Sequence, residues 1–126
     1  VDGDTIAVRL GDRRERVRYI GLDTPETVKP NAPVECYGPA ASALNARLVR
    51  AGTQVTLRFD RELRDRYGRL LAYVYRARDA LFVNAALVRD GAARVLPIPP
   101  NLAHAGTFAR LQAEARAAGR GLWGAC

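Results

Sequence analysis

Alternating apolar and polar positions dominate the first half of the chain and predict β-strands. Apolar residues recur at every second position between residues 6 and 10, which is the period of a half-buried strand. The Gly11-Asp12 pair that follows is typical of a hairpin turn. The same reasoning predicts further strands over residues 16–22, 55–59 and 71–75.

Helical spacing and chain breakers organise the rest of the sequence. Three prolines make residues 24–36 a loop, and apolar residues on one face then predict a helix over residues 37–51. A short helix is expected near residues 83–89 and a short strand over residues 93–96. After a further cluster of prolines, a last helix is predicted over residues 103–118.

This order of elements predicts one α+β domain, mainly β, over residues 1–126. Several short strands interrupted by one helix, with further helices appended, fit a small partly closed barrel. A plain antiparallel sheet with helices on one side is the alternative. The strand that should lead into Asp2 and Asp4 is missing from this chain, so the barrel is expected to have an open edge.

Composition points to a basic protein with a real core. The chain has 126 residues, of which 48% are hydrophobic, and a net charge of +7. Lys29 is its only lysine, so arginine supplies nearly all the positive charge. Such a surface attracts polyanions, nucleic acid before anionic lipid, but it also fits a protein with merely solvated charged faces. No apolar run reaches the length of a membrane span, no secretory signal is visible, and the first residue, Val1, suggests a trimmed product.

The two cysteines, Cys36 and Cys126, lack the close spacing of a zinc site. They are either two unrelated buried thiols or a disulfide. We favour the disulfide, because Cys126 ends the chain just after Trp123, where a free thiol has little reason to be buried. Closing so long a loop would contribute about 4–5 kcal/mol on the chain-entropy model. A disulfide would place the protein in an oxidising compartment.

Three acids and two arginines carry the candidate chemistry. The carboxylates of Asp4, Asp23 and Glu26 are hard oxygen ligands that suit Ca²⁺ or Mg²⁺. The guanidinium forks of Arg18 and Arg69 match a phosphate. Taken singly, each of these residues has a structural interpretation, such as a turn cap or an ion pair. Together on one surface they would suffice to break a phosphodiester with water.

Five short motifs occur in order along nearly the whole chain: Asp2-Gly3-Asp4-Thr5, Arg18, Asp23-Thr24-Pro25-Glu26-Thr27, Tyr37-Gly38-Pro39-Ala40-Ala41-Ser42 and Asp65-Arg66-Tyr67-Gly68-Arg69. In order and spacing they resemble the thermonuclease family, also called staphylococcal nuclease-like. Residues 83–91 and Gly121-Leu122-Trp123 add to the resemblance. It implies an oligonucleotide-binding-type five-stranded barrel with three helices, whose first strand is absent from this chain.

The resemblance also implies an activity, the Ca²⁺-dependent, sugar-nonspecific endonucleolytic hydrolysis of DNA and RNA to 3′-phosphate products. Carried over residue by residue, the carboxylates of Asp4 and Asp23 and the backbone carbonyl of Thr24 would bind the metal. Glu26 would be the general base that orients or deprotonates the attacking water.

Substrate-binding residues follow from the same resemblance. Arg18 and Arg69 match the phosphate-binding arginines, and Arg66 and Tyr67 match positions that contact a terminal phosphate. The chain departs from the family at Leu96-Pro97-Ile98-Pro99, where the best-known members carry tyrosines that line the base pocket. Two prolines, Pro97 and Pro99, stand in this stretch, which leaves base preference open.

Further expectations complete this interpretation. Some bacterial relatives carry a similar cysteine pair, so the resemblance supports the Cys36–Cys126 disulfide and a secreted or envelope-facing location. The protein is expected to be a monomer.

His104 is predicted to be surface or capping, and Tyr37 and Trp123 to be core. A nucleic-acid-binding module without catalysis and a basic structural domain are the alternative functions.

Overall fold

A curled four-stranded sheet and a small two-stranded sheet form the β part of the protein. The structure, a computed structural model, describes residues 3–27 and 33–126. In the larger sheet the order is β1 (Thr5–Leu10), β2 (Arg13–Tyr19), β5 (Leu70–Arg76) and β4 (Val55–Arg58). β2 runs parallel to β5, and the other two pairs are antiparallel. β3 (Leu22–Asp23) and β6 (Arg94–Val95) form the second sheet, which is antiparallel.

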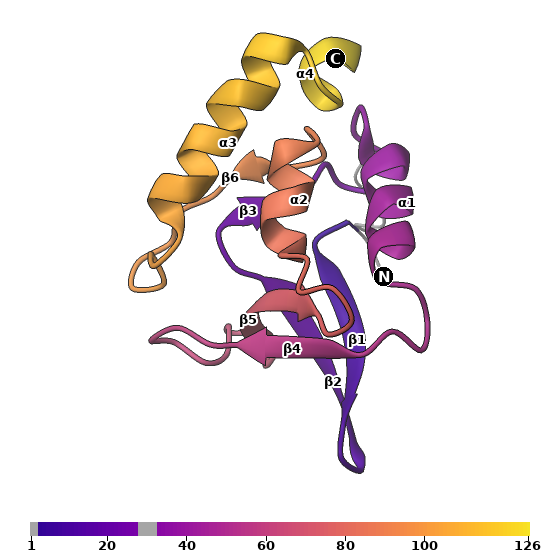
Figure 1. Cartoon of the computed structure of the whole chain (residues 1–126), viewed down its shortest axis with the longest axis vertical. Coiled ribbons are helices and arrows are strands. Elements are labelled where there is room, and N and C mark those ends of the chain that lie inside the picture. Colours follow the sequence, from indigo (N-terminus) through magenta and orange to yellow (C-terminus); the bar gives the residue numbers. More distant parts are fainter. Residues whose placement is uncertain (1–2, 28–32) are drawn as a thin grey trace.

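The helices gather at one end of the curled sheet. They are α1 (Gly38–Leu48), α2 (Val83–Arg89), α3 (Ala105–Ala118) and the single turn α4 (Leu122–Ala125). The hairpin of β1 and β2 projects at the opposite end of the molecule (Figure 1). A half-barrel of mixed strands with three main helices confirms the predicted α+β fold of the oligonucleotide-binding type.

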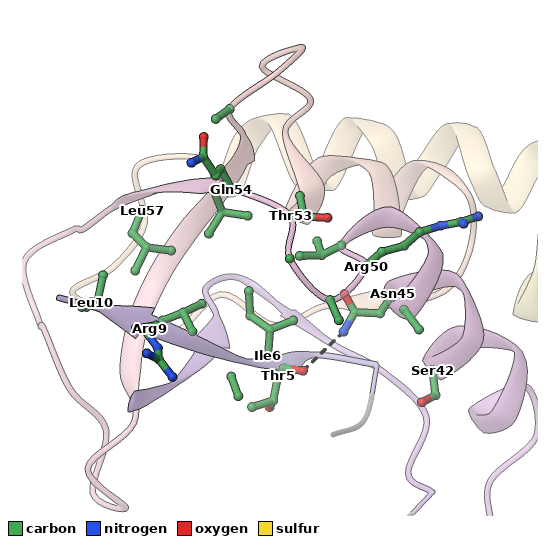
Figure 2. A pocket seen from close by; sticks show the side chains of 18 residues that line it. Thr5, Ile6, Arg9, Leu10, Ser42, Asn45, Arg50, Thr53, Gln54 and Leu57 are labelled. Carbon is green, nitrogen blue, oxygen red and sulfur yellow. Dashed lines mark hydrogen bonds between the residues drawn. The ribbon is translucent and has the colours of Figure 1, made fainter. Parts of the chain in front are cut away.

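The sheet has two outer strands with free edges. Within residues 3–27 and 33–126, β1 pairs only with β2, and β4 pairs only with β5. A groove of about 860 Å³ lies between these edges, lined by the whole of β1, by α1 and by part of β4 (Figure 2). The open edge expected from the sequence is therefore present.

The strand predicted over residues 16–22 was wrong at both ends. β2 begins at Arg13 and ends at Tyr19, and the chain then reverses before β3. Gly21 makes this turn with a φ of +89°, and a Cβ at this position would overlap the ring of Phe108. Helix α3 packs here so closely that the turn needs a residue without a side chain.

A buried asparagine fixes this turn to the core. The Asn84 side-chain amide donates hydrogen bonds to the carbonyls of Ile20 (3.1 Å) and Ala72 (3.3 Å). Its carbonyl oxygen accepts a bond from the Val74 backbone N–H (2.9 Å). One side chain of α2 therefore holds β5 and the chain just after β2 together, which positions the residues at the end of β2.

The predictions for three aromatic residues had different outcomes. Tyr37 packs against the main core, as expected, whereas Trp123 is only half-buried. His104 precedes α3 without a side-chain cap bond. His104 is the N-cap residue of α3 and is half-buried, so the predicted position at the helix start is confirmed. Its ring, however, lies 4.5 Å from that of Tyr73 and 5.0 Å from that of Phe82. His104 belongs to an aromatic cluster under α3.

Cys36 and Cys126 form the predicted disulfide, with a Cα–Cα distance of 6.1 Å. The bond joins residues 90 positions apart. It ties the C-terminal turn α4 to the loop before α1, and these two segments lie side by side in Figure 1.

Replacing both cysteines by serine is expected to lower the free energy of unfolding by about 2–5 kcal/mol, because the unfolded chain regains the entropy of a long open loop. Urea unfolding followed by circular dichroism measures the change. Dithiothreitol should bring the parent to the variant's midpoint and leave the variant unaffected. Equal midpoints for parent and variant without reductant would contradict the prediction.

Candidate active site

Two carboxylates that are distant in the sequence meet at the end of β2. The register of β1 on β2 pairs Thr5 with Arg18, so Asp4 lies beside the last residues of β2. The Tyr19 backbone N–H donates to the Asp4 carbonyl at 2.9 Å. After the turn at Gly21, β3 brings Asp23 back to the same place.

Arg18 joins the two acids. Its Nη2 atom lies 3.5 Å from Oδ2 of Asp4 and 3.4 Å from Oδ1 of Asp23. Its Nη1 atom donates to the carbonyls of Tyr19 (2.9 Å) and Leu22 (2.8 Å). The side chain is 15% exposed. Four partners fix the guanidinium, and both carboxylates converge on one of its nitrogens.

The two acids sit in different environments. Asp4 is buried, and its carboxylate accepts bonds from the Thr5 hydroxyl (3.1 Å) and the Thr24 backbone N–H (3.3 Å). The Asp23 side chain is 59% exposed. Partial burial raises the pKa of Asp23 above its ordinary value; the Arg18 guanidinium opposes the shift, and the Asp4 carboxylate adds to it.

This oxygen set fits a hard divalent cation. Asp4 and Asp23 offer carboxylate oxygens at one point, and Thr24, which is buried, adjoins Asp23 in the chain. In the part of the chain that the structure describes, no cluster of three or more His, Cys, Asp or Glu side chains could hold an ion. Glu26 therefore does not complete a three-carboxylate cage, and backbone oxygen and water would have to supply the remaining ligands.

Glu26 is held by a residue that the sequence analysis missed. The Glu26 N–H donates to Oε1 of Glu35 (2.7 Å), and the Glu35 N–H donates to the Glu26 carbonyl (2.9 Å). Glu35 precedes the disulfide residue Cys36, so the crosslink anchors this pair. The sequence holds no signal for it, because only the folded loop brings the two glutamates together. The loop's central residues, including Lys29, lie outside the described residues, as does Asp2.

Arg69 is held by the turn that precedes β5. The Asp65 carboxylate accepts bonds from the Arg69 backbone N–H (2.9 Å) and from its Nε (2.8 Å). Burial alone would raise the pKa of Asp65, but these bonds from Arg69 hold it below its ordinary value. The Asp65 carboxylate therefore stays ionised and keeps the guanidinium in place.

Arg66 and Tyr67 stand at the tip of this turn. Arg66 Nη2 lies 2.7 Å from the Tyr67 hydroxyl. The guanidinium carbons of Arg66 and Arg69 lie 4.9 and 5.4 Å from the centre of the Tyr67 ring. Tyr67 is 63% exposed, so this cationic and aromatic group is open to a ligand.

A cavity of about 380 Å³ connects the two arginine-bearing regions. Arg18 lines it from one side, and the turn residues Arg66, Tyr67 and Arg69 line it from the other. Because Arg18 also touches both metal-site candidates, the cavity adjoins the two carboxylates. The structure thus brings together the predicted metal and phosphate residues. Glu26 lies on the adjoining loop, three residues after Asp23.

Of the two prolines that stand in the base-pocket stretch, only Pro99 lines this cavity, together with aliphatic side chains. Leu96, Ile98 and Pro99 line the cavity, whereas Pro97 lines a separate small pocket under α3. Leu96 and Ile98 are 38% and 58% exposed. Alternation after β6 could have indicated these two residues, because side chains two positions apart in an extended chain share a face.

Comparison with known proteins finds one family and several nucleases that are similar to this chain. Residues 16–125 match a family described as "Staphylococcal nuclease homologue". The chain is 44% identical over 123 residues to a thermonuclease of Staphylococcus intermedius, covering 98% of this chain and 71% of that protein. It is 38% identical to a thermonuclease of Staphylococcus hyicus, with the same coverage of both chains. It is 42% identical over 125 residues to endonuclease YncB of Bacillus subtilis, covering 98% of this chain and 58% of that protein.

Proposed function

This chain belongs to the staphylococcal nuclease family and is a nucleic-acid hydrolase, and we propose that it cleaves DNA and RNA with Ca²⁺ and leaves 3′-phosphate ends. One observation carries the assignment to this site. Arg18 contacts both Asp4 and Asp23 and also lines the cavity that contains Arg69. A phosphodiester in that cavity therefore lies between two guanidinium groups and beside two carboxylates.

The arginines bind the scissile phosphate. Negative charge grows on its non-bridging oxygens as water attacks, and the fixed forks of Arg18 and Arg69 meet that charge where it develops. Preorganisation matters here, because Arg18 is held by two backbone carbonyls and Arg69 by Asp65 before substrate arrives.

Glu26 acts as the general base for the attacking water. Its carboxylate accepts the proton as the water oxygen bonds to phosphorus. The bond from phosphorus to the 5′ oxygen breaks, the 5′ oxygen takes up a proton, and the phosphate stays on the 3′ side. Glu35 holds the Glu26 backbone while this happens. A cation bound by Asp4, Asp23 and the Thr24 carbonyl would add Lewis-acid stabilisation of the phosphate and lower the pKa of the water.

Chelation with EDTA is expected to abolish digestion of both single-stranded DNA and RNA, and added Ca²⁺ should restore it. Without the cation, the Asp4 and Asp23 carboxylates would repel the phosphate, and nothing would lower the pKa of the attacking water. A denaturing gel measures product length, and Mg²⁺ in place of Ca²⁺ tests the choice of metal. Undiminished digestion in EDTA would overturn the metal assignment. A shifted but uncut band with Ca²⁺ present would favour a binding module without catalysis.

The disulfide supports a location outside the reducing cytosol, such as the cell envelope or the medium. No described helix is both long and apolar enough to cross a membrane. We infer that the protein acts as a monomer on polymeric nucleic acid.

A further inference from the structure

One face of the hairpin of β1 and β2 carries a row of arginines. Ile6 and Val8 point to the core, and the residues that follow each of them in β1, Ala7 and Arg9, are exposed on the other face. The register places Arg9 opposite Arg14 and Ala7 opposite Arg16 on that outer face. In Figure 2, Arg9 lies on the other side of β1 from the groove residue Leu57. We call Arg9, Arg14 and Arg16 the arginine row.

The arginine row is electrostatically unfavourable in the absence of a ligand. Arg9 and Arg14 are a directly opposed pair of like charges, which destabilises a sheet. All three residues of the row are exposed, and no ion pair joins any of them to an acid within the described part of the chain. Glu15, the acid in the same strand, points to the opposite face and binds Arg64 at 2.9 Å. A polyanionic ligand would relieve the repulsion between Arg9 and Arg14.

The arginine row continues along β2 to Arg18 in the candidate active site. Arg14, Arg16 and Arg18 occupy every second position of β2, so they share one face at intervals of about 6–7 Å. Arg18, at the end of this series, contacts Asp4 and Asp23. The hairpin itself projects away from the helices, which leaves its outer face accessible (Figure 1).

We propose that the arginine row binds the phosphates of a single nucleic-acid strand and guides that strand into the site at Arg18. The proposal rests on the proposed nuclease function and extends it, because it makes a polymeric strand, rather than a short fragment, the preferred ligand. Each guanidinium contacts a phosphate without reading a base, so the binding is independent of sequence and weakens with salt.

The test uses Glu26→Gln protein, so that cleavage is slowed while DNA binding is measured. The row variant adds Arg9→Gln, Arg14→Gln and Arg16→Gln. A matched control variant adds Arg47→Gln on α1, Arg50→Gln just after α1 and Arg78→Gln beyond β5. These three exposed arginines also lack ion pairs within the described residues. Both variants lose the same charge. Fluorescence anisotropy measures binding to a single DNA strand of about 12 nucleotides over a range of salt concentrations.

The row variant should bind this strand at least about tenfold more weakly at low salt, and its slope of log affinity against log salt should be smaller by about 2, or about 0.7 for each lost phosphate contact. The control variant should stay close to the parent. The melting temperature of the row variant should be unchanged or higher, because a like-charge pair is removed.

Equal losses in the row and control variants would overturn the proposal, since affinity would then follow net charge alone. So would loss of binding to phosphatidylserine vesicles with DNA binding intact, because the row would then be a membrane surface. Failure of the nuclease proposal is a separate outcome: the protein with native Glu26 would bind DNA without cutting it, while the reduced slope of the row variant would still support the row.

Discussion

Glu26→Gln is expected to lower kcat on single-stranded DNA by about 10²–10⁴-fold, the range that a positioned general base contributes. Glutamine keeps the size of the side chain and leaves the backbone bonds to Glu35 in place, but it cannot take the proton of the attacking water. Metal affinity should change little, because Glu26 does not share a three-carboxylate cluster with Asp4 and Asp23.

Stopped assays of acid-soluble product measure kcat, and isothermal titration with Ca²⁺ measures metal binding. Glu114→Gln is the matched control, because Glu114 is an exposed acid of α3 that pairs only with Arg110 among the described residues. Digestion at the parental rate by Glu26→Gln would remove Glu26 from the mechanism. A large loss of Ca²⁺ affinity would instead make it a metal ligand.

Arg18→Lys should reduce kcat by about 10²–10³-fold, because a single donor aimed at a developing oxyanion contributes about 3–4 kcal/mol. Lysine retains the charge but has no planar fork. It cannot bond the carbonyls of Tyr19 and Leu22 while also facing Asp4 and Asp23. The phosphate would therefore lose a donor fixed in advance.

Steady-state kinetics on DNA separates this effect from weaker binding, since loss of transition-state stabilisation lowers kcat as well as kcat/KM. Arg47→Lys, on the exposed face of α1, is the control for the change of residue type. Thermal unfolding checks that the lysine variant is folded at the assay temperature. A folded Arg18→Lys protein with kcat within about threefold of the parent would contradict the role given to the guanidinium.

The sequence alone identified Glu26 and Arg18 as site residues, but it did not predict the contacts that hold Arg18 in place. Glu26 and Arg18 were both identified from their motifs, and the alternation of β2 placed Arg18 on the side away from Val17. The contact of one Arg18 nitrogen with both Asp4 and Asp23 could not be foreseen. It depends on the turn at Gly21, where the sequence predicted a continuous strand.

The cavity wall illustrates a second limit. The family resemblance drew attention to Pro97 and Pro99, because they stand in the stretch where relatives carry base-pocket tyrosines. The residues of this stretch that line the cavity are Leu96, Ile98 and Pro99, and Pro97 does not line it. Which side of an irregular segment faces a cavity is set by what packs on the other side. Here Pro97 packs beneath α3 near Phe108.

Local patterning determined the elements of this protein and the chemical types at its site. Strands and helices can be predicted from apolar spacing, because side chains on one face recur every second residue in a strand and every 3.6 residues in a helix. The residue types alone indicate that the site combines oxygen ligands for a cation with guanidinium groups for a phosphate, wherever the fold places these side chains. Only the tertiary structure determined which side chains meet. Glu35 binds the Glu26 backbone, Arg18 lies between Asp4 and Asp23, and His104 packs among aromatic rings. These contacts join residues across turns and between elements, and their energies depend on the packing of the whole chain rather than on any segment's own sequence.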